Sequence, residues 1–362
     1  MTSLDDLPLR DDLRGKTPYG APQLRVPVEL NVNENTHPVP PAVVDDIVER
    51  VREALGSINR YPDREFTELR EAFAGYLGHG LSAANIWAAN GSNEVLQHLL
   101  QAFGGPGRTA LGFVPTYSMY PLLADGTGTA WIAAGRDVDF ELSVETARAA
   151  IAEHDPDIVM LCTPNNPTGT PLDLDVIRAV CQASRGIVIV DEAYQEFAPE
   201  GSPSALSLLA EFPRLVVSRT MSKAFAFAGA RVGYLAADSA VCDALRLVRL
   251  PYHLSALTQA AALGALAYQR EMLAMVDEIR QQRDRLLVEL AGLGYAPAAS
   301  SANFVLFGNV ANPHDTFEAL LKRGVLIRDV GIPHTLRVTA GTEAETTAFL
   351  TALAEVARPL AP

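Results

Sequence analysis

The order of apolar and polar residues changes character at about residue 40 of this 362-residue chain. From there on, short runs of β-branched and other apolar residues alternate with longer segments in which apolar positions recur every three or four residues. The short runs predict buried strands, and the longer segments predict amphipathic helices. This alternation is typical of βαβ units with a parallel sheet, so the sequence predicts an α/β fold.

Four segments after residue 80 show the pattern clearly. Residues 85–103 predict a short strand, a Gly-Ser-Asn turn and an amphipathic helix, and residues 214–223 predict another buried strand. Residues 157–169 and 186–197 predict strands that end in a Pro/Asn/Gly loop and in acidic residues, respectively. The carboxyl ends of parallel strands share one edge of a sheet, where α/β proteins bind ligands. The residues expected at this edge are Ser92, Asn93, Asn166, Asp191, Tyr194, Thr220, Ser222 and Lys223.

The ends of the chain differ from this central part. Residues 249–268 and 271–295 predict two long helices, and the remaining residues predict a small α+β unit. The first 35 residues contain several prolines and are expected to be extended across another surface. We therefore expect an N-terminal arm over 1–35, a large domain over 36–250 and a small C-terminal domain over 251–362.

Composition narrows the classes of function. A formal net charge of −14, without a run of arginines, argues against nucleic-acid binding. The three cysteines are far apart and form no CxxC pair, and the histidines show no ligand spacing, so we expect no metal site. The acidic start lacks an apolar signal core and no apolar stretch is long enough to span a membrane, which favours a cytoplasmic location.

Lys223 stands out because the chain contains only two other lysines, Lys16 and Lys322. The window from Ser218 to Tyr234 holds no acidic residue that could pair with it. A buried lysine is costly unless its pKa falls, and a desolvated lysine is a good Schiff-base nucleophile. An exposed lysine at the end of a strand is the alternative interpretation.

The neighbours of Lys223 favour the chemical interpretation. Thr220 and Ser222 supply hydroxyl groups, Arg231 supplies a guanidinium, and Gly229 is expected to let backbone approach closely. Hydroxyl groups with one arginine suit a phosphate. The Asn-Gly-Ser-Asn-Glu turn, residues 90–94, opens a helix and offers free N–H groups to the same anion, although alone it could be an ordinary helix cap.

Other residues at this edge suit an aromatic ring. Asp191 needs a cationic partner to remain charged when buried, and a protonated ring nitrogen is one candidate. Asn166 and Tyr194 can donate to a phenolate-like oxygen, and Tyr117 can stack on a ring. Taken separately, Asp191 could cap a helix and Tyr117 could belong to the core. Together with Lys223 they describe a pyridoxal 5'-phosphate site, and the nucleotide motifs GxxxxGK[ST] and GxGxxG are absent.

A family resemblance extends over nearly the whole chain. The segments "TPNNPTG", "DEAY", "SKAFAFAGARVGY", "NRYPD" and "LRVTAGT" resemble those of the fold-type I pyridoxal-phosphate aminotransferases of class II. More narrowly, "KTPYGAPQ", "NVNEN", "AANGSNEVL", "VPTYSMY", "SANFVLF" and "GVLIRDVG" resemble the histidinol-phosphate aminotransferases of actinobacteria. This resemblance implies a large domain with a mainly parallel central sheet flanked by helices, and a smaller α+β domain.

The resemblance also implies roles for individual residues. Lys223 would bond to the cofactor aldehyde and act as base, and Asp191 would pair with the ring nitrogen. Asn166 and Tyr194 would contact the ring 3-oxygen, and Tyr117 would stack on the ring. The residues implied at the cofactor phosphate are Ser92, Asn93, Thr220, Ser222 and Arg231, with Tyr61 reaching over from the partner subunit of a homodimer.

Four residues are implied on the substrate side. Arg337 matches the arginine that holds the anionic group of the substrate in this fold, and Arg328 matches an additional arginine directed at the substrate phosphate. Two guanidinium groups suit a dianionic phosphate better than one carboxylate. Tyr19 and Asn33 line the substrate side in the family. From the residues alone, both arginines could also be surface residues of the small domain.

The implied reaction transfers the amino group of L-histidinol phosphate to 2-oxoglutarate, giving imidazole-acetol phosphate and L-glutamate in histidine biosynthesis. An aromatic amino acid aminotransferase on the same scaffold is the nearest alternative, because a pocket for imidazole can admit other flat rings. A pyridoxal-phosphate decarboxylase of a phospho-amino acid is a further one. A transcriptional sensor that binds the cofactor without turnover would need a DNA-binding domain, for which no residues remain.

Overall fold

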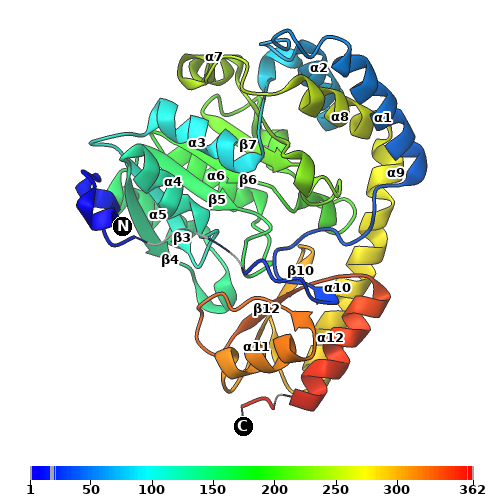
Figure 1. Cartoon of the computed structure of the whole chain (residues 1–362). Coiled ribbons are helices and arrows are strands. Elements are labelled where there is room, and N and C mark those ends of the chain that lie inside the picture. Colours follow the sequence, from blue (N-terminus) through cyan, green and yellow to red (C-terminus); the bar gives the residue numbers. More distant parts are fainter. Residues whose placement is uncertain (1, 17–19, 21, 357, 361–362) are drawn as a thin grey trace.

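A seven-stranded sheet forms the centre of the larger part of the molecule (Figure 1). The computed structural model describes residues 2–16, 20, 22–356 and 358–360. Strand β8 runs antiparallel to its neighbours β2 and β7, and every other pair of neighbours is parallel. The strand order is β2 (Ile86–Ala89), β8 (Gly233–Ala237), β7 (Leu215–Thr220), β6 (Ile187–Asp191), β5 (Ile158–Cys162), β3 (Thr109–Val114) and β4 (Ala130–Gly135).

Burial explains why these segments are strands. Strands β5, β6, β7 and β8 are buried along their whole length, as expected for apolar runs in a sheet that is covered on both faces. The flanking helices bury one apolar side each; in α3 this side includes Val95, Leu96 and Leu99. These helices are α1 (Pro41–Leu55), α2 (Thr67–Leu77), α3 (Ser92–Phe103), α4 (Met119–Thr127), α5 (Val144–His154), α6 (Leu174–Ala183), α7 (Ser239–Val248) and α8 (Ala256–Ala267). The predicted α/β fold with a mainly parallel sheet is confirmed.

The smaller part combines short strands with long helices. A three-stranded antiparallel sheet has the order β12 (Leu336–Thr339), β10 (Phe304–Gly308) and β9 (Ala296–Pro297). Strand β1 (Val28–Glu29) of the N-terminal segment pairs in parallel with β11 (Val325–Leu326). After α9 (Gln269–Leu273), the helices of this part are α10 (Met275–Gly292), α11 (Pro313–Lys322) and α12 (Glu343–Val356). Figure 1 shows α10 running from the larger part down along the smaller one.

Two apolar clusters of buried residues correspond to the two parts. The larger cluster includes Leu254, Ala262 and Met272. The smaller one includes Val276 and most of the buried apolar residues that follow it in the chain. Helix α8 therefore packs with the larger part. The division between the clusters falls near the start of α10, later in the chain than the boundary expected at residue 250.

The strand register sets the position of the pocket. Cys162 lies beside Asp191, and Asp191 lies beside Ser218, so β5 and β6 end at the same level and β7 continues for two further residues. The N-terminal segment approaches the same edge, because Lys223, just after β7, donates to the Val32 carbonyl at 2.9 Å. Among the described helices, none is both long and apolar enough to cross a membrane.

Candidate active site

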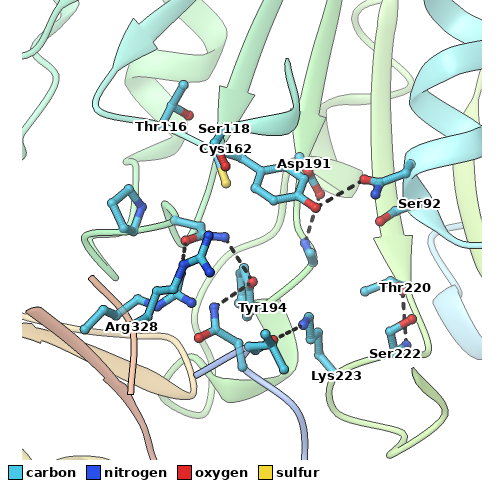
Figure 2. A pocket seen from close by; sticks show the side chains of 18 of the residues that line it. Ser92, Thr116, Ser118, Cys162, Asp191, Tyr194, Thr220, Ser222, Lys223 and Arg328 are labelled. Atoms are coloured by element: carbon cyan, nitrogen blue, oxygen red, sulfur yellow. Dashed lines mark hydrogen bonds between the residues drawn. The ribbon is translucent and has the colours of Figure 1, made fainter. Parts of the chain in front are cut away.

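A cavity of about 420 Å³ lies at the carboxyl ends of the parallel strands, between the two parts of the molecule. Most of the side chains predicted from the sequence line it. They are Asn33, Ser92, Asn93, Tyr117, Asn166, Asp191, Tyr194, Thr220, Ser222, Lys223, Arg231, Arg328 and Arg337. In Figure 2, Thr220 and Ser222 lie on one side of Lys223 and Tyr194, and Arg328 lies on the other. The cavity therefore has an end rich in hydroxyl groups and an end with arginines.

One predicted residue does not line this cavity, and another cannot be placed because it lies outside the described residues. The side chain of Tyr61 is 79% exposed and stacks on Tyr252, with ring centroids 4.4 Å apart. In this single chain it lies between α1 and α2, away from the cavity lining. Tyr19 lies outside the described residues.

Lys223 follows β7 and reaches into the cavity. Its Nζ donates to the Val32 carbonyl at 2.9 Å and lies 5.9 Å from the centre of the Tyr194 ring. Desolvation, together with the positive charges of Arg337 and Arg231, lowers the pKa of Lys223 to about 8, against the opposing charge of Glu34. A lysine with this pKa has a sizeable neutral, nucleophilic fraction near neutral pH.

Asp191 ends β6 as a buried carboxylate. It accepts hydrogen bonds from Tyr120 Oη at 3.0 Å, from Ser218 Oγ at 3.2 Å and from the Ala193 N–H at 3.3 Å. Burial raises the pKa of Asp191 to about 6, although these three donors oppose the rise. No basic side chain within the described residues forms an ion pair with it, so the carboxylate is available to a cationic ligand.

Polar side chains from three segments meet at the Tyr194 hydroxyl. Asn33 Nδ2 lies 3.0 Å from this oxygen and Asn166 Nδ2 lies 3.3 Å from it. Arg337 Nη1 donates to Asn166 Oδ1 at 2.6 Å, which fixes the orientation of that amide. Burial raises the pKa of Tyr194 above its usual value, so this hydroxyl stays protonated and can donate.

The hydroxyl-rich end forms a cup for an anion. Thr220 Oγ1 accepts from the Ser222 N–H at 3.1 Å, and Arg231 Nη1 lies 3.4 Å from Ser222 Oγ. Gly91 caps α3 without a side chain that could accept from the first N–H groups of the helix. The first turn of α3, including Ser92 and Asn93, lines the cavity.

Close backbone approach occurs at other glycines than the one predicted. A Cβ on Gly91, whose φ is +89°, would overlap the Arg231 guanidinium, and a Cβ on Gly233 would overlap the backbone of Ser92. Gly229 has open space around it, so the expectation that it allows close approach was wrong. Gly91 and Gly233 are therefore the positions where a side chain would not fit, at the place where β8 passes the start of α3.

Arg328 and Arg337 lie side by side at the other end. Their backbones exchange two hydrogen bonds, of 3.0 and 2.9 Å, in an isolated antiparallel bridge. Arg337 is buried, and its Nη2 donates to the Asn31 carbonyl at 2.9 Å. Arg328 is half-buried, and no carboxylate of the described chain forms an ion pair with it. Two guanidinium groups that line one cavity could bind an anion with two negative charges.

Sequence reasoning missed several groups of this site. Tyr120 and Ser218 position Asp191, and the Val32 carbonyl positions Lys223. Tyr120 follows Tyr117 by three residues, and this spacing places both rings on one side of a helical turn, where their planes meet edge to face at 5.5 Å. That spacing was the one signal in the sequence that could have indicated Tyr120.

The chemistry of the donor set is therefore specific. The cavity offers an amine, a carboxylate available to a cation, donors for an oxygen, a cup for an anion, and a separate pair of arginines. This set fits a cofactor that carries an aldehyde, a ring nitrogen and a phosphate, together with an anionic substrate. Within the described residues, no group of His, Cys, Asp and Glu side chains is arranged to hold a metal ion.

Comparisons with known proteins agree with this chemistry. The family described as aminotransferase class I and II matches residues 25–353. The histidinol-phosphate aminotransferase of Paenarthrobacter aurescens is 63% identical to this chain, over 99% of this chain and 97% of that protein. The enzyme of the same name from Thermobifida fusca is 58% identical, over 97% and 96%, respectively. Among solved structures, histidinol-phosphate aminotransferase from Sinorhizobium meliloti in complex with pyridoxal-5'-phosphate is 27% identical with a TM-score of 0.81, and the match covers 92% of this chain and 91% of that one.

Proposed function

The chain belongs to the class I and II aminotransferase family, and we infer that it is the aminotransferase of L-histidinol phosphate. It transfers the amino group of this substrate to 2-oxoglutarate, releasing imidazole-acetol phosphate and L-glutamate in histidine biosynthesis. The observation that carries this function is one cavity that holds the Lys223 amine between the anion cup and the adjacent pair Arg328 and Arg337. The family predicted from the sequence motifs is confirmed.

Pyridoxal 5'-phosphate is the proposed cofactor. When bound, it supplies an electron sink for the electrons released at the substrate α-carbon. Lys223 would hold its aldehyde carbon, Asp191 its ring nitrogen, and Asn166 and Tyr194 its ring oxygen, with Tyr117 against the ring face. The cup that would hold its phosphate consists of Ser92, Asn93, Thr220, Ser222 and Arg231. The uncompensated charge of buried Asp191 and the space left by Gly91 and Gly233 support this assignment.

The residues of the chain then perform the proton transfers. With the cofactor bound, the neutral amine of Lys223 would be the base that removes the proton from the substrate α-carbon. Its lowered pKa of about 8 lets the neutral amine form near physiological pH. Asp191 as a carboxylate keeps a proton on the ring nitrogen, which stabilises negative charge that develops at the α-carbon.

The proposed substrate contacts lie at the arginine end. Arg328 and Arg337 would bind the substrate phosphate, and the carboxylate of 2-oxoglutarate would use the same charges in the second half of the reaction. Asn33 lines this side of the cavity, and Tyr19, which lies outside the described residues, is proposed to complete it. Because both arginines face the cavity, they are not merely surface charges of the small part.

A homodimer with shared active sites is the proposed assembly. Exposed apolar side chains follow α1 up to Ile58 and again run from Leu247 to Tyr252, and the two segments meet at the stacked rings of Tyr61 and Tyr252. Tyr61 would then reach the cofactor phosphate of the partner subunit. The three buried free cysteines suit a reducing compartment, and we place the enzyme in the cytoplasm.

Mixing two inactive variants tests the shared site. In a mixed dimer of Tyr61→Ala and Lys223→Ala subunits, one site has both Tyr61 and Lys223 intact. Activity should therefore return on mixing and exceed that of either variant alone. If the mixture stays as inactive as its components while mixed dimers are present, Tyr61 does not serve the partner subunit.

Competition between amino donors tests the substrate. Purified enzyme is given histidinol phosphate and phenylalanine together with 2-oxoglutarate, and kcat/KM is compared. We expect a preference for histidinol phosphate, because phenylalanine has no phosphate for the arginine pair. A preference for phenylalanine would instead identify an aromatic amino acid aminotransferase. Release of carbon dioxide from a phosphorylated amino acid, in a separate assay without 2-oxoglutarate, would identify a decarboxylase.

A further inference from the structure

The loop between α7 and α8, residues 249–255, lies directly behind the anion cup. His253 Nε2 lies 2.9 Å from the Ala88 carbonyl of β2, and a carbonyl only accepts, so Nε2 carries the proton and donates. The His253 carbonyl in turn accepts from Asn90 Nδ2 at 2.8 Å. One residue of the loop thus contacts the chain at two points immediately before Gly91 and Ser92.

Asn90 links the His253 carbonyl to the first turn of α3 by hydrogen bonds. Its backbone N–H donates to Glu94 Oε2 at 2.5 Å, and its Nδ2 donates to the same oxygen at 2.7 Å. The Asn-Gly-Ser-Asn turn, residues 90–93, is therefore held from behind by His253 and from ahead by Glu94. These contacts limit the movement of Ser92 and Asn93 relative to Thr220, Ser222 and Arg231, the other residues of the cup.

The ring of His253 is fixed by aromatic neighbours. It stacks on Trp87 at 5.6 Å with an interplanar angle of 10°, and it meets the edges of Phe66 and His98 at 5.6 and 5.4 Å. Trp87 is fully buried and donates to His98 Nδ1 at 3.2 Å. This packing leaves His253 one orientation, which aims its donor at β2.

The other end of the loop holds the segment of Tyr61. Tyr252, next to His253, stacks on Tyr61, and Arg249 binds both Glu65 and the Arg64 carbonyl. The loop thus lies between the anion cup of its own subunit and Tyr61, the tyrosine proposed to reach the cofactor phosphate of the partner subunit. The same loop therefore contacts both the turn of the anion cup and the segment of Tyr61.

We propose that His253 is a positioning residue for cofactor binding, which holds the 90–93 turn so that Ser92 and Asn93 can bind the cofactor phosphate. This proposal rests on the proposed function, since it takes the phosphate to be that of pyridoxal phosphate. His253 does not line the cavity and acts only through Ala88 and Asn90. Its contribution should therefore depend on whether the bound molecule carries a phosphate.

Pyridoxal, which lacks the phosphate, provides the discriminating measurement. The dissociation constants of pyridoxal phosphate and pyridoxal are measured by absorbance titration of the cofactor-free protein, for wild type, His253→Phe and His253→Gln. Phe keeps the stacked ring and removes the donor, which should weaken binding of pyridoxal phosphate about tenfold while leaving pyridoxal unchanged. Gln keeps a donor near the position of Nε2 and should restore binding to within about twofold.

Two further variants separate positioning from folding. Asn90→Leu removes the second contact of the turn and should show the same selective loss for pyridoxal phosphate. His98 belongs to the same aromatic cluster but forms no hydrogen bond with the 90–93 turn. His98→Phe should therefore lower the melting temperature, and it should weaken the binding of pyridoxal phosphate and pyridoxal equally or leave both unchanged. Equal weakening of both ligands by His253→Phe and by Asn90→Leu would overturn the proposal. Failure of the wild-type protein to bind pyridoxal phosphate would instead refute the proposed cofactor.

Discussion

The two walls of the active-site cavity are built in different ways. On one wall, Asp191, Thr220 and Lys223 follow strands of one sheet, whose register places them side by side. On the other wall, Arg328 and Arg337 come from a small bridge in the last part of the chain, and Asn33 comes from the N-terminal segment. The first wall holds groups with shifted pKa values, whereas the second holds permanent charges. We propose that the sheet wall supplies the chemistry and that the arginine wall selects the substrate.

Loss of the lysine should have the largest effect, because it removes the nucleophile and base of the sheet wall. Lys223→Ala should abolish turnover, a loss of at least about 10⁴-fold in kcat. The anion cup remains, so the variant should still bind pyridoxamine phosphate. Lys322→Ala, which removes an exposed lysine on α11, is the matched control and should be fully active. Full activity of Lys223→Ala would contradict the mechanism.

Asp191→Asn tests the second group of the sheet wall. The amide has no charge to keep a proton on the ring nitrogen, so kcat should fall by about 10²- to 10³-fold. KM for histidinol phosphate should change little, because the arginine wall is untouched. A large rise in KM with kcat preserved would show that the two walls do not divide their roles as stated.

The arginine wall should show the opposite pattern. Arg328→Gln removes charge-assisted hydrogen bonds to the substrate phosphate and should lower kcat/KM for histidinol phosphate by about 10- to 100-fold. The value for phenylalanine should stay nearly constant. Arg323→Gln is a matched control, since this exposed arginine pairs with Glu355 on the surface. Equal losses for both amino donors would remove Arg328 from substrate selection.

The groups whose titration sets the pH dependence of cofactor capture should be Lys223 and Asp191 of the sheet wall, with the charge of Arg337 helping to lower the pKa of Lys223. The neutral Lys223 amine is the reacting form, so the capture rate by cofactor-free protein should rise about tenfold per pH unit up to about pH 8 and then level off. Below about pH 6, protonation of Asp191 should weaken binding further. Stopped-flow absorbance measures both. Arg328→Gln should leave these midpoints in place, and a midpoint near pH 10.5 would show that the lysine is not desolvated.

Tyr120→Phe should produce the smallest effect of this series. It removes one of the three hydrogen bonds to the Asp191 carboxylate, so the pKa of Asp191 should rise and the acid midpoint of cofactor binding should move to higher pH. We expect a loss of roughly tenfold or less in kcat, in line with one lost hydrogen bond. An unchanged midpoint would limit Tyr120 to packing.

Much of the sheet wall could be predicted from the sequence. Apolar runs that end in Asp191 and in Thr220 to Lys223 show both where the strands lie and which residues follow them. These signals depend on residues that are adjacent in the chain, and the parallel sheet converts them into one edge. The roles assigned to individual side chains remain predictions until the variants above are measured.

The contacts between distant segments were decided by the tertiary structure. The sequence could not show that Asn33 lies 3.0 Å from the Tyr194 hydroxyl or that Val32 accepts from Lys223, because these pairs are far apart in the chain. It also pointed to Gly229, whereas Gly91 and Gly233 make the close approach. Local periodicity depends only on near neighbours, but the distance between two elements depends on how their side chains pack. The sequence by itself therefore determined which strands end in reactive residues, the lysine and the family. Only packing determined the close approach of Gly91 and Gly233 in the cup, the hydrogen bonds to Asp191 and the backbone pairing of Arg328 with Arg337.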